Sequence, residues 1–317
     1  MTIAGAYSGG GMAHATRILP FSDDAIAEAA RLIVEAEPVA VATETVYGLA
    51  ADATNAAAVA RIYEAKGRPS FNPLIVHVRD LAMADEIGDF SEHAKALAGR
   101  YWPGPLTLVV PLRQGAEIAS LVAAGLRTIA LRVPAHQAMQ GLLRTVGRPL
   151  AAPSANASGS ISPTRAEHVL KSLGGRIPLI VDSGPTERGI ESTIVAGTGG
   201  DLRLLRRGPI HIDEAVEQGG RAIEAPGQLA SHYAPSKPLR LNVTDAAANE
   251  FLIGFDTVDG DATLSASGDL VEAAAKLFNL LHLADDASAE RIAVAPIPDR
   301  GLGAALNEPL RRGGAPP

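Results

Sequence analysis

The sequence predicts an α/β protein built from two domains. Its 317 residues exceed the roughly 100–200 residues of one ordinary domain. Short apolar runs alternate with helical patterns along most of the chain. A stretch rich in Pro, Gly and small residues interrupts this alternation and is typical of an extended linker. These observations predict a larger first domain and a smaller second one.

The first part of the chain alternates between helical and strand patterns. We expect helices at 23–36, 55–66 and 91–101, and strands at 39–43, 74–78, 106–112 and 128–133. A helix opening at Ser162-Pro163-Thr164 precedes strands near 177–181, 193–195 and 202–205. Thr164 and Glu167 have the spacing of a capping box. The predicted domain spans 17–218 and follows a flexible extension at 1–16.

The linker is predicted at 219–238, where periodicity disappears. A strand at 251–255, a helix at 269–283, a strand at 292–295 and a short closing helix follow. This order predicts a small open parallel sheet, Rossmann-like, in residues 239–317. Gly301-Leu-Gly303 follows the last strand but lacks the third glycine of a dinucleotide fingerprint, so we interpret it as a helix-start loop.

Composition excludes several classes of protein. The chain has no cysteine, which rules out disulfides and Cys-ligated metals. No apolar run approaches the ~20 residues that span a bilayer, and the N-terminus lacks the pattern of a secretory signal. The net charge of -7 argues against a protein whose main role is to hold nucleic acid. We therefore expect a soluble, cytoplasmic protein without a membrane or a stable nucleic-acid complex.

Four polar clusters interrupt the apolar runs of the first domain. They are Thr43 to Gly48, Lys66 to Pro69, Ala152 to Asn156, and Gly189 to Thr193. Loops at strand ends are where an open α/β sheet commonly places its ligands. No Lys follows a Gly anywhere in the chain, so a Walker A phosphate loop is excluded.

Lys66-Gly67-Arg68 has two interpretations. A cationic last helical turn followed by Gly and Pro is an ordinary helix end, and the pattern alone favours this. Alternatively, Lys and Arg two residues apart offer a point charge and a planar fork to a triphosphate.

Three further candidates carry alternatives of the same kind. Ser154 and Asn156 fit a simple turn. His77, within an apolar run, is more often a satisfied core histidine than a ligand contact. Arg132 is harder to explain as structure, because an arginine on a buried strand needs an anionic partner, and a carboxylate substrate would serve.

Several motifs, taken together and in order, resemble the YrdC-domain family across roughly residues 18 to 212. They are TETVYGLAAD, Lys66-Gly-Arg68 with Asn72-Pro-Leu-Ile-Val-His77, Trp102-Pro-Gly-Pro-Leu-Thr107, Leu131-Arg-Val-Pro134, APSAN-x-SG, DSGPT and GIESTIV. The remainder, with Ser231-His-Tyr233-Ala-Pro235, is similar to the longer, two-domain threonylcarbamoyl-AMP synthases. Ala42 and Ala51 depart from the family pattern without removing a functional group.

The resemblance implies a twisted mixed sheet around a concave, basic cavity. It also implies a nucleotidyltransferase reaction, in which the amine of L-threonine captures CO2 from bicarbonate and the carbamate attacks the α-phosphate of ATP, expelling pyrophosphate. The product, L-threonylcarbamoyladenylate, would pass to a downstream complex that makes N6-threonylcarbamoyladenosine in tRNA. Mg2+ is expected to bind together with ATP, and the protein is not expected to have a structural metal site of its own.

The resemblance assigns the candidate site residues. L-threonine would be held by Thr45, His77, Arg132, Ser154 and Ser192. ATP would meet Lys66, Arg68, Asn72, Thr128, Asn156, Thr164 and Arg206, with Tyr233 reaching in from the linker. Lys66 and Arg68 would stabilise phosphate charge and are the catalytic candidates. A double-stranded RNA-binding or nucleotide-sensing regulatory protein is the alternative.

Overall fold

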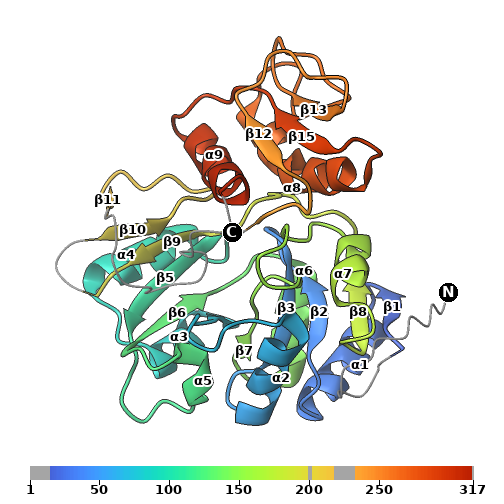
Figure 1. Ribbon diagram of the computed structural model, residues 1–317. Helices are drawn as coiled ribbons and strands as arrows, with labels where there is room; N and C mark the ends of the chain where they lie inside the picture. Colours follow the sequence, from blue (N-terminus) through green and yellow to red (C-terminus); the bar gives the residue numbers. More distant parts are fainter. Residues whose placement is uncertain (1–14, 199–201, 218–232, 316–317) are drawn as a thin grey trace.

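The computed structural model describes residues 15–198, 202–217 and 233–315 (Figure 1). Most of the extension expected at 1–16 and most of the linker expected at 219–238 lie outside the described residues. The first domain and the C-terminal part each contain one β-sheet.

The first domain is organised by a mixed sheet whose strand order is β1-β8-β2-β3-β7-β4-β6-β5-β9-β10-β11. Parallel pairs such as β4 with β6 alternate with antiparallel pairs such as β5 with β6. The strands are β1 (Arg17–Pro20), β2 (Val39–Ala42), β3 (Tyr47–Asp52), β4 (Ile75–His77), β5 (Leu106–Pro111), β6 (Thr128–Arg132), β7 (Leu150–Ala151), β8 (Leu179–Asp182), β9 (Thr193–Ala196), β10 (Arg203–Arg206) and β11 (Val216–Glu217). The predicted α/β fold with a mixed sheet is confirmed.

Helices pack on the two faces of this sheet. They are α1 (Asp23–Val34), α2 (Ala56–Lys66), α3 (Leu81–Ile87), α4 (Glu92–Tyr101), α5 (Ser120–Ala123), α6 (Gln137–Val146) and α7 (Ala166–Leu173). In β2, Ala40 faces the core that contains α2, α4 and α7, whereas Val39 and Val41 face the core made with α1 and α6. This alternation follows from the two-residue period of a strand and explains why β2 is apolar throughout.

The C-terminal part forms a second, smaller α/β unit. Its sheet has the order β12-β15-β13-β14 and every pairing in it is parallel, as predicted. The elements are β12 (Leu239–Leu241), β13 (Glu250–Gly254), β14 (Ala262–Thr263), α8 (Leu270–Asp286), β15 (Arg291–Val294) and α9 (Leu302–Gly313). Gly301 is the N-cap residue of α9, which agrees with its interpretation as a helix start.

The capping box predicted at Thr164 and Glu167 is wrong. Helix α7 begins at Ala166, and its N-cap residue is Arg165, which makes no side-chain capping bond. The chain is still extended at Arg165, and the Thr164 carbonyl accepts a hydrogen bond from Thr186 N–H instead of starting a helix. Periodicity also fails to reveal β3, α3 and α6. In β3, the small residues of Tyr47–Asp52 are buried throughout and leave no polar alternation to detect.

The two units share one apolar cluster. Val46, Ile161 and Ile190 of the first domain pack into the core formed around Phe278 of α8. Gly189, with φ of +64°, lies directly against α8, where a Cβ would approach the Ala274 carbonyl oxygen to 2.3 Å. Loops of the polar clusters predicted from the sequence therefore rest on the C-terminal unit.

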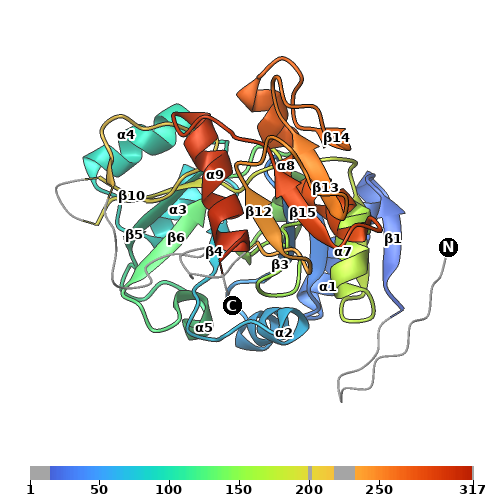
Figure 2. The ribbon, with the colours of Figure 1, turned by 45° about the horizontal axis from the view of Figure 1, so that its top comes forward.

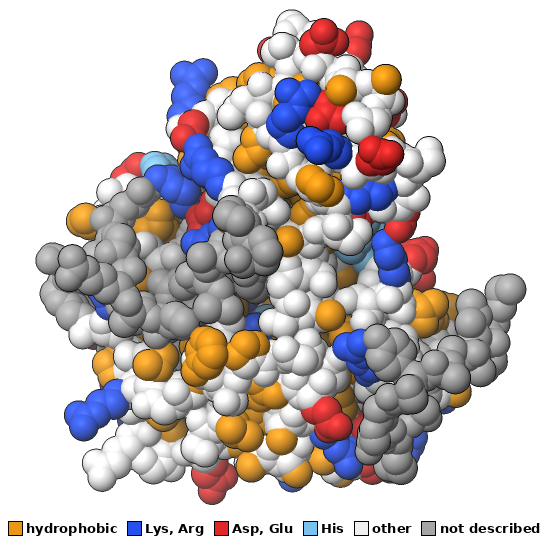
Figure 3. Space-filling view, in the orientation of Figure 1, with side chains coloured by type: hydrophobic (Ala, Val, Ile, Leu, Met, Phe, Trp, Pro, Cys, Tyr) orange, Lys and Arg blue, Asp and Glu red, His pale blue; other side chains and the backbone are white. Residues whose placement is uncertain are grey.

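Charged side chains of both signs are interspersed on the surface. Figure 3 shows Lys and Arg side chains beside Asp and Glu over the C-terminal unit. Lys276 with Glu272 is such a pair, 2.5 Å apart. Among the described helices, none is both long and apolar enough to cross a bilayer.

Replacing Gly189 should loosen the contact between the units. Gly189→Ala would meet the positive-φ cost of about 1–2 kcal/mol and, in addition, an overlap with α8 costing a further ~1–3 kcal/mol. Gly147→Ala is the matched control, because Gly147 also has a positive φ but open space around its Cβ position. Urea unfolding measures the free energy of unfolding of each variant. An equal loss in Gly189→Ala and Gly147→Ala would contradict the proposed overlap with α8.

Candidate active site

Strand alternation places His77 and Arg132 on the same side of the sheet. In the parallel pair β4–β6, His77 lies opposite Arg132 and Val76 lies opposite Leu131. Val76 and Leu131 belong to the main helix-covered core. His77 and Arg132 therefore project from the other face, where both line a cavity.

A β-bulge brings Arg206 to the same face. In the β9–β10 pair, Leu204 lies opposite Val195 and Arg206 opposite Ile194, so Leu205 is an extra residue in the ladder. Without this residue the direction of Arg206 would be reversed. Bulges commonly re-aim a side chain in this way next to functional sites.

The cavity encloses about 490 Å³, its open mouth included. Its lining combines cationic, hydroxyl and apolar groups from the four predicted clusters and the strands between them. The lining residues are Thr43, Thr45, Val46, Gly48, Arg68, Ile75, His77, Arg132, Ala152, Pro153, Ser154, Glu191, Ser192 and Arg206. Every residue predicted for L-threonine, namely Thr45, His77, Arg132, Ser154 and Ser192, is among them.

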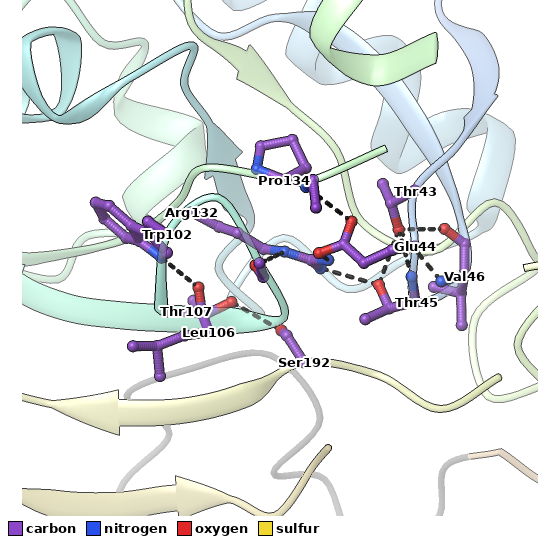
Figure 4. A network of polar contacts seen from close by, with 12 residues as sticks. Thr43, Glu44, Thr45, Val46, Trp102, Leu106, Thr107, Arg132, Pro134 and Ser192 are labelled. Atoms are coloured by element: carbon purple, nitrogen blue, oxygen red, sulfur yellow. Dashed lines mark hydrogen bonds and ion pairs between the residues drawn. The ribbon is translucent and has the colours of Figure 1, made fainter. Parts of the chain in front are cut away.

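The guanidinium of Arg132 is held by a buried carboxylate (Figure 4). Arg132 Nη2 donates to Glu44 Oε1 over 2.7 Å, Nη1 to Thr45 Oγ1 over 3.0 Å, and Nε to the Gly104 carbonyl. Glu44 Oε2 also accepts from Ala135 N–H. Although burial raises it, the charge and hydrogen bond of Arg132 hold the pKa of Glu44 below its usual value. The anion that a buried Arg132 needs is thus supplied by the protein itself.

The hydroxyl of Thr45 is positioned by Thr43. Thr43 Oγ1 accepts from Thr45 N–H and Val46 N–H, and lies 2.8 Å from Thr45 Oγ1. Such a side-chain turn fixes the loop that follows β2. Thr45 therefore presents its hydroxyl at the cavity wall beside Arg132.

His77 is not a satisfied core histidine. It is 2% exposed, and neither ring nitrogen has a hydrogen-bond partner among the described residues. Burial, followed by the charge of Arg132, lowers the pKa of His77 well below its usual value, so the ring is neutral. A buried, unpartnered imidazole costs free energy. Its position in the cavity wall favours a ligand contact.

Arg206 belongs to a second carboxylate-centred network. It pairs with Glu191 through Nη1, and Nη2 donates to Ser192 Oγ over 3.0 Å. Ser192 Oγ in turn lies 2.8 Å from Thr107 Oγ1. Tyr233 is 3% exposed, donates its hydroxyl to Glu191 Oε2 over 3.0 Å and stacks on Phe278. Tyr233 thus reaches the Arg206 side of the cavity through Glu191.

Lys66 and Arg68 follow the helix-end pattern but are not solvated. Gly67 is a left-handed C-cap, as an ordinary helix end predicts. Lys66 is nevertheless 2% exposed and donates Nζ to the carbonyls of Ser154 and Asn156. Arg68 donates to the carbonyls of Asn72 and Pro73. Burial lowers the pKa of both cations, and among the described residues neither has a carboxylate partner.

The comparisons with known proteins agree with this geometry. A family model described as "Telomere recombination" matches residues 31–208, and one described as "Threonylcarbamoyl-AMP synthase, C-terminal domain" matches 190–315. The threonylcarbamoyl-AMP synthase of Bacillus subtilis is 39% identical over 93% of this chain and 94% of its own length. That of Pyrococcus abyssi is 36% identical over 90% of this chain and 92% of its own.

This chain belongs to the threonylcarbamoyl-AMP synthase family. A solved structure extends the similarity to the fold. The crystal structure of P. abyssi Sua5 complexed with L-threonine has a TM-score of 0.86 and 34% identity, and covers 94% of this chain and 97% of that one. The members of this family are enzymes, and the chain is therefore a nucleotidyltransferase.

Not every residue that the family resemblance assigns to ATP lines the cavity. Asn72 and Asn156 lie on the loops that hold Arg68 and Lys66, and both have buried side-chain atoms without a partner among the described residues. Asn156 Nδ2 donates a hydrogen bond to the Ser160 carbonyl. This local bond agrees with the interpretation of Asn156 as part of a simple turn. Thr164 is buried near His168. Thr128 is at the opposite end of β6 from Arg132 and is not part of the cavity wall.

Sequence reasoning missed two functional candidates of this family member, Glu44 and Glu191. Both occur inside motifs quoted from the sequence, yet neither was assigned a role. The available signal was Arg132 itself, because a buried arginine requires an anion and these motifs carry the acidic residues.

Removing the carboxylate of Glu44 should destabilise the protein strongly. Glu44→Gln leaves the Arg132 charge buried and uncompensated, at a cost of about 3–5 kcal/mol in the free energy of unfolding. Glu92→Gln is the control, since its pair with Lys95 is exposed and 3.8 Å long, and such a pair contributes at most ~1 kcal/mol. Denaturant titration of both variants checks this, and a small, similar loss in each would refute the role of Glu44.

Proposed function

We propose that this protein forms L-threonylcarbamoyladenylate and pyrophosphate from L-threonine, bicarbonate-derived CO2 and ATP. The product would then serve the N6-threonylcarbamoyladenosine modification of tRNA by a downstream transfer complex. We also propose that the protein acts in the cytoplasm.

One observation carries the proposal. Three arginines that are nearly inaccessible to solvent, Arg68, Arg132 and Arg206, converge on one cavity in a chain of this family. Burying cations is costly unless an anion offsets the lost hydration. Glu44 supplies that anion for Arg132 and Glu191 for Arg206, whereas Arg68 has no carboxylate partner among the described residues. A polyphosphate and an amino-acid carboxylate are anions of the class that this cavity can hold.

The part of the cavity that we assign to L-threonine contains an arginine paired with a carboxylate, together with uncharged side chains. Arg132 is fixed by Glu44 and Gly104, so its remaining N–H groups are oriented before any ligand arrives. Thr45 and Ser154 offer hydroxyls, and the neutral ring of His77 offers a nitrogen without a partner. This set would orient both the carboxylate and the amine of L-threonine, which brings the amine to CO2 in a fixed geometry.

We assign to the nucleotide half the two cations, Lys66 and Arg68, that have no carboxylate partner in the described part of the chain. Lys66 and Arg68 would neutralise charge on the polyphosphate as the carbamate oxygen attacks the α-phosphorus and the bond to pyrophosphate breaks. Both cations are desolvated in advance, so their interaction with a developing charge is stronger than in water. Arg206 would contact the same anion from the opposite wall.

Mg2+ is proposed to accompany ATP rather than to be held by the protein. Magnesium favours oxygen ligands and commonly binds through substrate phosphates with one or two carboxylates. Glu191 is the acidic residue that lines the cavity, and among the described residues no group of three or more His, Asp or Glu could hold a metal. When bound, Mg2+ would neutralise part of the polyphosphate charge.

A direct assay tests the reaction. The purified protein is incubated with ATP, Mg2+, bicarbonate and L-threonine while pyrophosphate release and the mass of the nucleotide product are followed. We expect a threonylcarbamoyl adenylate whose formation requires both threonine and bicarbonate. Pyrophosphate or product that is independent of threonine would contradict the proposal. Salt-sensitive RNA binding without product would favour the RNA-binding alternative instead.

Arg68 should be essential to turnover. Arg68→Met removes a charge from the proposed polyphosphate site and should lower kcat/KM for ATP by about 10²–10³-fold. Arg68→Lys keeps the charge but loses the planar fork, so a partial loss is expected. Arg61→Met is the control and should retain full activity, because Arg61 lies on α2, which ends before Arg68, and pairs with Glu37. Equal activity of the Arg68→Met and Arg61→Met variants would refute the assignment.

A further inference from the structure

Helices α7 and α8 lie side by side at the boundary between the two units, as both ribbon views show (Figures 1 and 2). Three contacts join the two helices, and they follow one another in the same order along each helix. Arg165 Nε donates to Asn279 Oδ1 over 2.9 Å, His168 stacks on His282, and Lys171 pairs with Asp286. The contacts are spaced by about one helical turn, so one face of α8 packs along one face of α7 and its N-cap residue, Arg165.

The two histidines form the centre of this contact, with His282 buried and His168 partly buried. Their ring centroids are 3.8 Å apart with an interplanar angle of 20°. His282 Nε2 lies 3.2 Å from the Ser162 carbonyl oxygen, which can only accept, so Nε2 carries a proton. His168 Nδ1 lies 3.3 Å from Thr164 N–H, which can only donate, so Nδ1 is the acceptor. Both rings therefore contact the backbone of the segment 162–165.

That segment carries groups of the nucleotide half of the cavity. Thr164 is an ATP candidate, and Ser162 Oγ donates to Glu191 Oε1 over 2.8 Å. Glu191 in turn pairs with Arg206 and accepts the Tyr233 hydroxyl. The path from α8 to the guanidinium of Arg206 thus consists of His282, Ser162 and Glu191 in direct succession.

Most of the threonine half is tied down differently, the exception being Ser192, which accepts a hydrogen bond from Arg206. Arg132 is held by Glu44 and Gly104, and Thr45 by Thr43, all within the first domain. A change in the contact between His282 and Ser162 would therefore act on the nucleotide half first.

The histidine pair is neutral in the folded protein. Burial, followed by the charge of the other ring, lowers the pKa of His168 to about 3, and burial lowers that of His282 to about 4. Arg165 and Lys171 disfavour protonation of His168, while Asp285 and Asp286 favour protonation of His282. Since the usual value is 6.5, the contact is fully stable above that pH and weakens as the pH falls from there toward about 3.

We propose that His282 of the C-terminal unit is a positioning residue for the nucleotide half of the active site. Its hydrogen bond to Ser162 holds the segment 162–165, and through Glu191 it holds Arg206 in the orientation that receives the polyphosphate. This inference rests on the proposed use of ATP. It assigns the C-terminal unit a part in nucleotide binding without direct contact with the nucleotide.

Two substitutions of similar volume separate the hydrogen bond from the packing. His282→Phe keeps a ring against His168 but cannot donate to the Ser162 carbonyl. His282→Gln loses the ring but retains an N–H donor. We expect His282→Phe to raise the KM for ATP by about five- to tenfold, the effect of one buried hydrogen bond. The KM for L-threonine should rise by a smaller factor, because Arg206 contacts the threonine site only at Ser192. His282→Gln should restore the KM for ATP to near the wild-type value.

Leu283→Ala is the control, because Leu283 neighbours His282 on α8 but is half exposed. Thermal unfolding of each variant shows whether stability changes alongside. A KM for ATP that is the same in His282→Phe as in wild type overturns the inference, as does an equal rise in both KM values. Failure of the wild-type protein to make the adenylate would instead refute the proposed function, so the two failures are distinguishable.

Discussion

The dehydration of three arginines that line one cavity, and of Lys66 bonded to the carbonyl of the lining residue Ser154, is the constraint on which this structure depends. Lys66, Arg68, Arg132 and Arg206 are all less than a tenth exposed. Two of them are compensated within the protein, since Arg132 pairs with Glu44 and Arg206 with Glu191. Lys66 and Arg68 are satisfied by backbone carbonyls, which accept hydrogen bonds but carry no full charge. The cavity is thereby divided into a compensated part and a part with excess positive charge.

The mixed sheet makes this arrangement possible. Period-two alternation sends His77 and Arg132 to the cavity face, while their neighbours Val76 and Leu131 complete the core on the other side. The bulge at Leu205 turns Arg206 to the same face. The C-terminal unit then supports the loops that complete the cavity, because Val46 and Ile190 pack into its core. Core packing and site geometry therefore depend on the same contacts.

Much of the first domain could be predicted from its sequence because long amphipathic helices and apolar strands leave periodic patterns. Helices α1, α2 and α4 begin and end within a few residues of their predicted positions. The strand β3 could not be predicted in this way, since Tyr47–Asp52 is buried on both faces. The start of α7 was misplaced because Thr164 bonds Thr186 and lies near His168, contacts that no local spacing reveals.

The candidate site shows the same division between local and long-range information. The polar clusters were visible as interruptions of apolar runs, and the family resemblance assigned roles within them. The pairing of Arg132 with Glu44 spans 88 positions, and that of His282 with Ser162 spans 120. Contacts at such separations follow from the tertiary fold and not from motif spacing. Thr128 illustrates the converse, because the family resemblance assigns it to ATP while it lies at the end of β6 that is away from the cavity.

Charge compensation also offers a reason why one cavity would hold the two dissimilar substrates proposed for it. An amino acid such as threonine is a zwitterion and carries no net charge, which suits the wall where Arg132 is already neutralised by Glu44. A triphosphate retains negative charge even when Mg2+ is bound, which suits the wall at Arg68. Neither Arg68 nor Lys66, which is buried against the lining residue Ser154, has a carboxylate partner among the described residues. Burial lowers the pKa of Lys66, and an adjacent polyphosphate would raise it again by favouring the protonated form. The cationic character of that wall would thus be greatest when a nucleotide is bound, which is when the proposed reaction requires it.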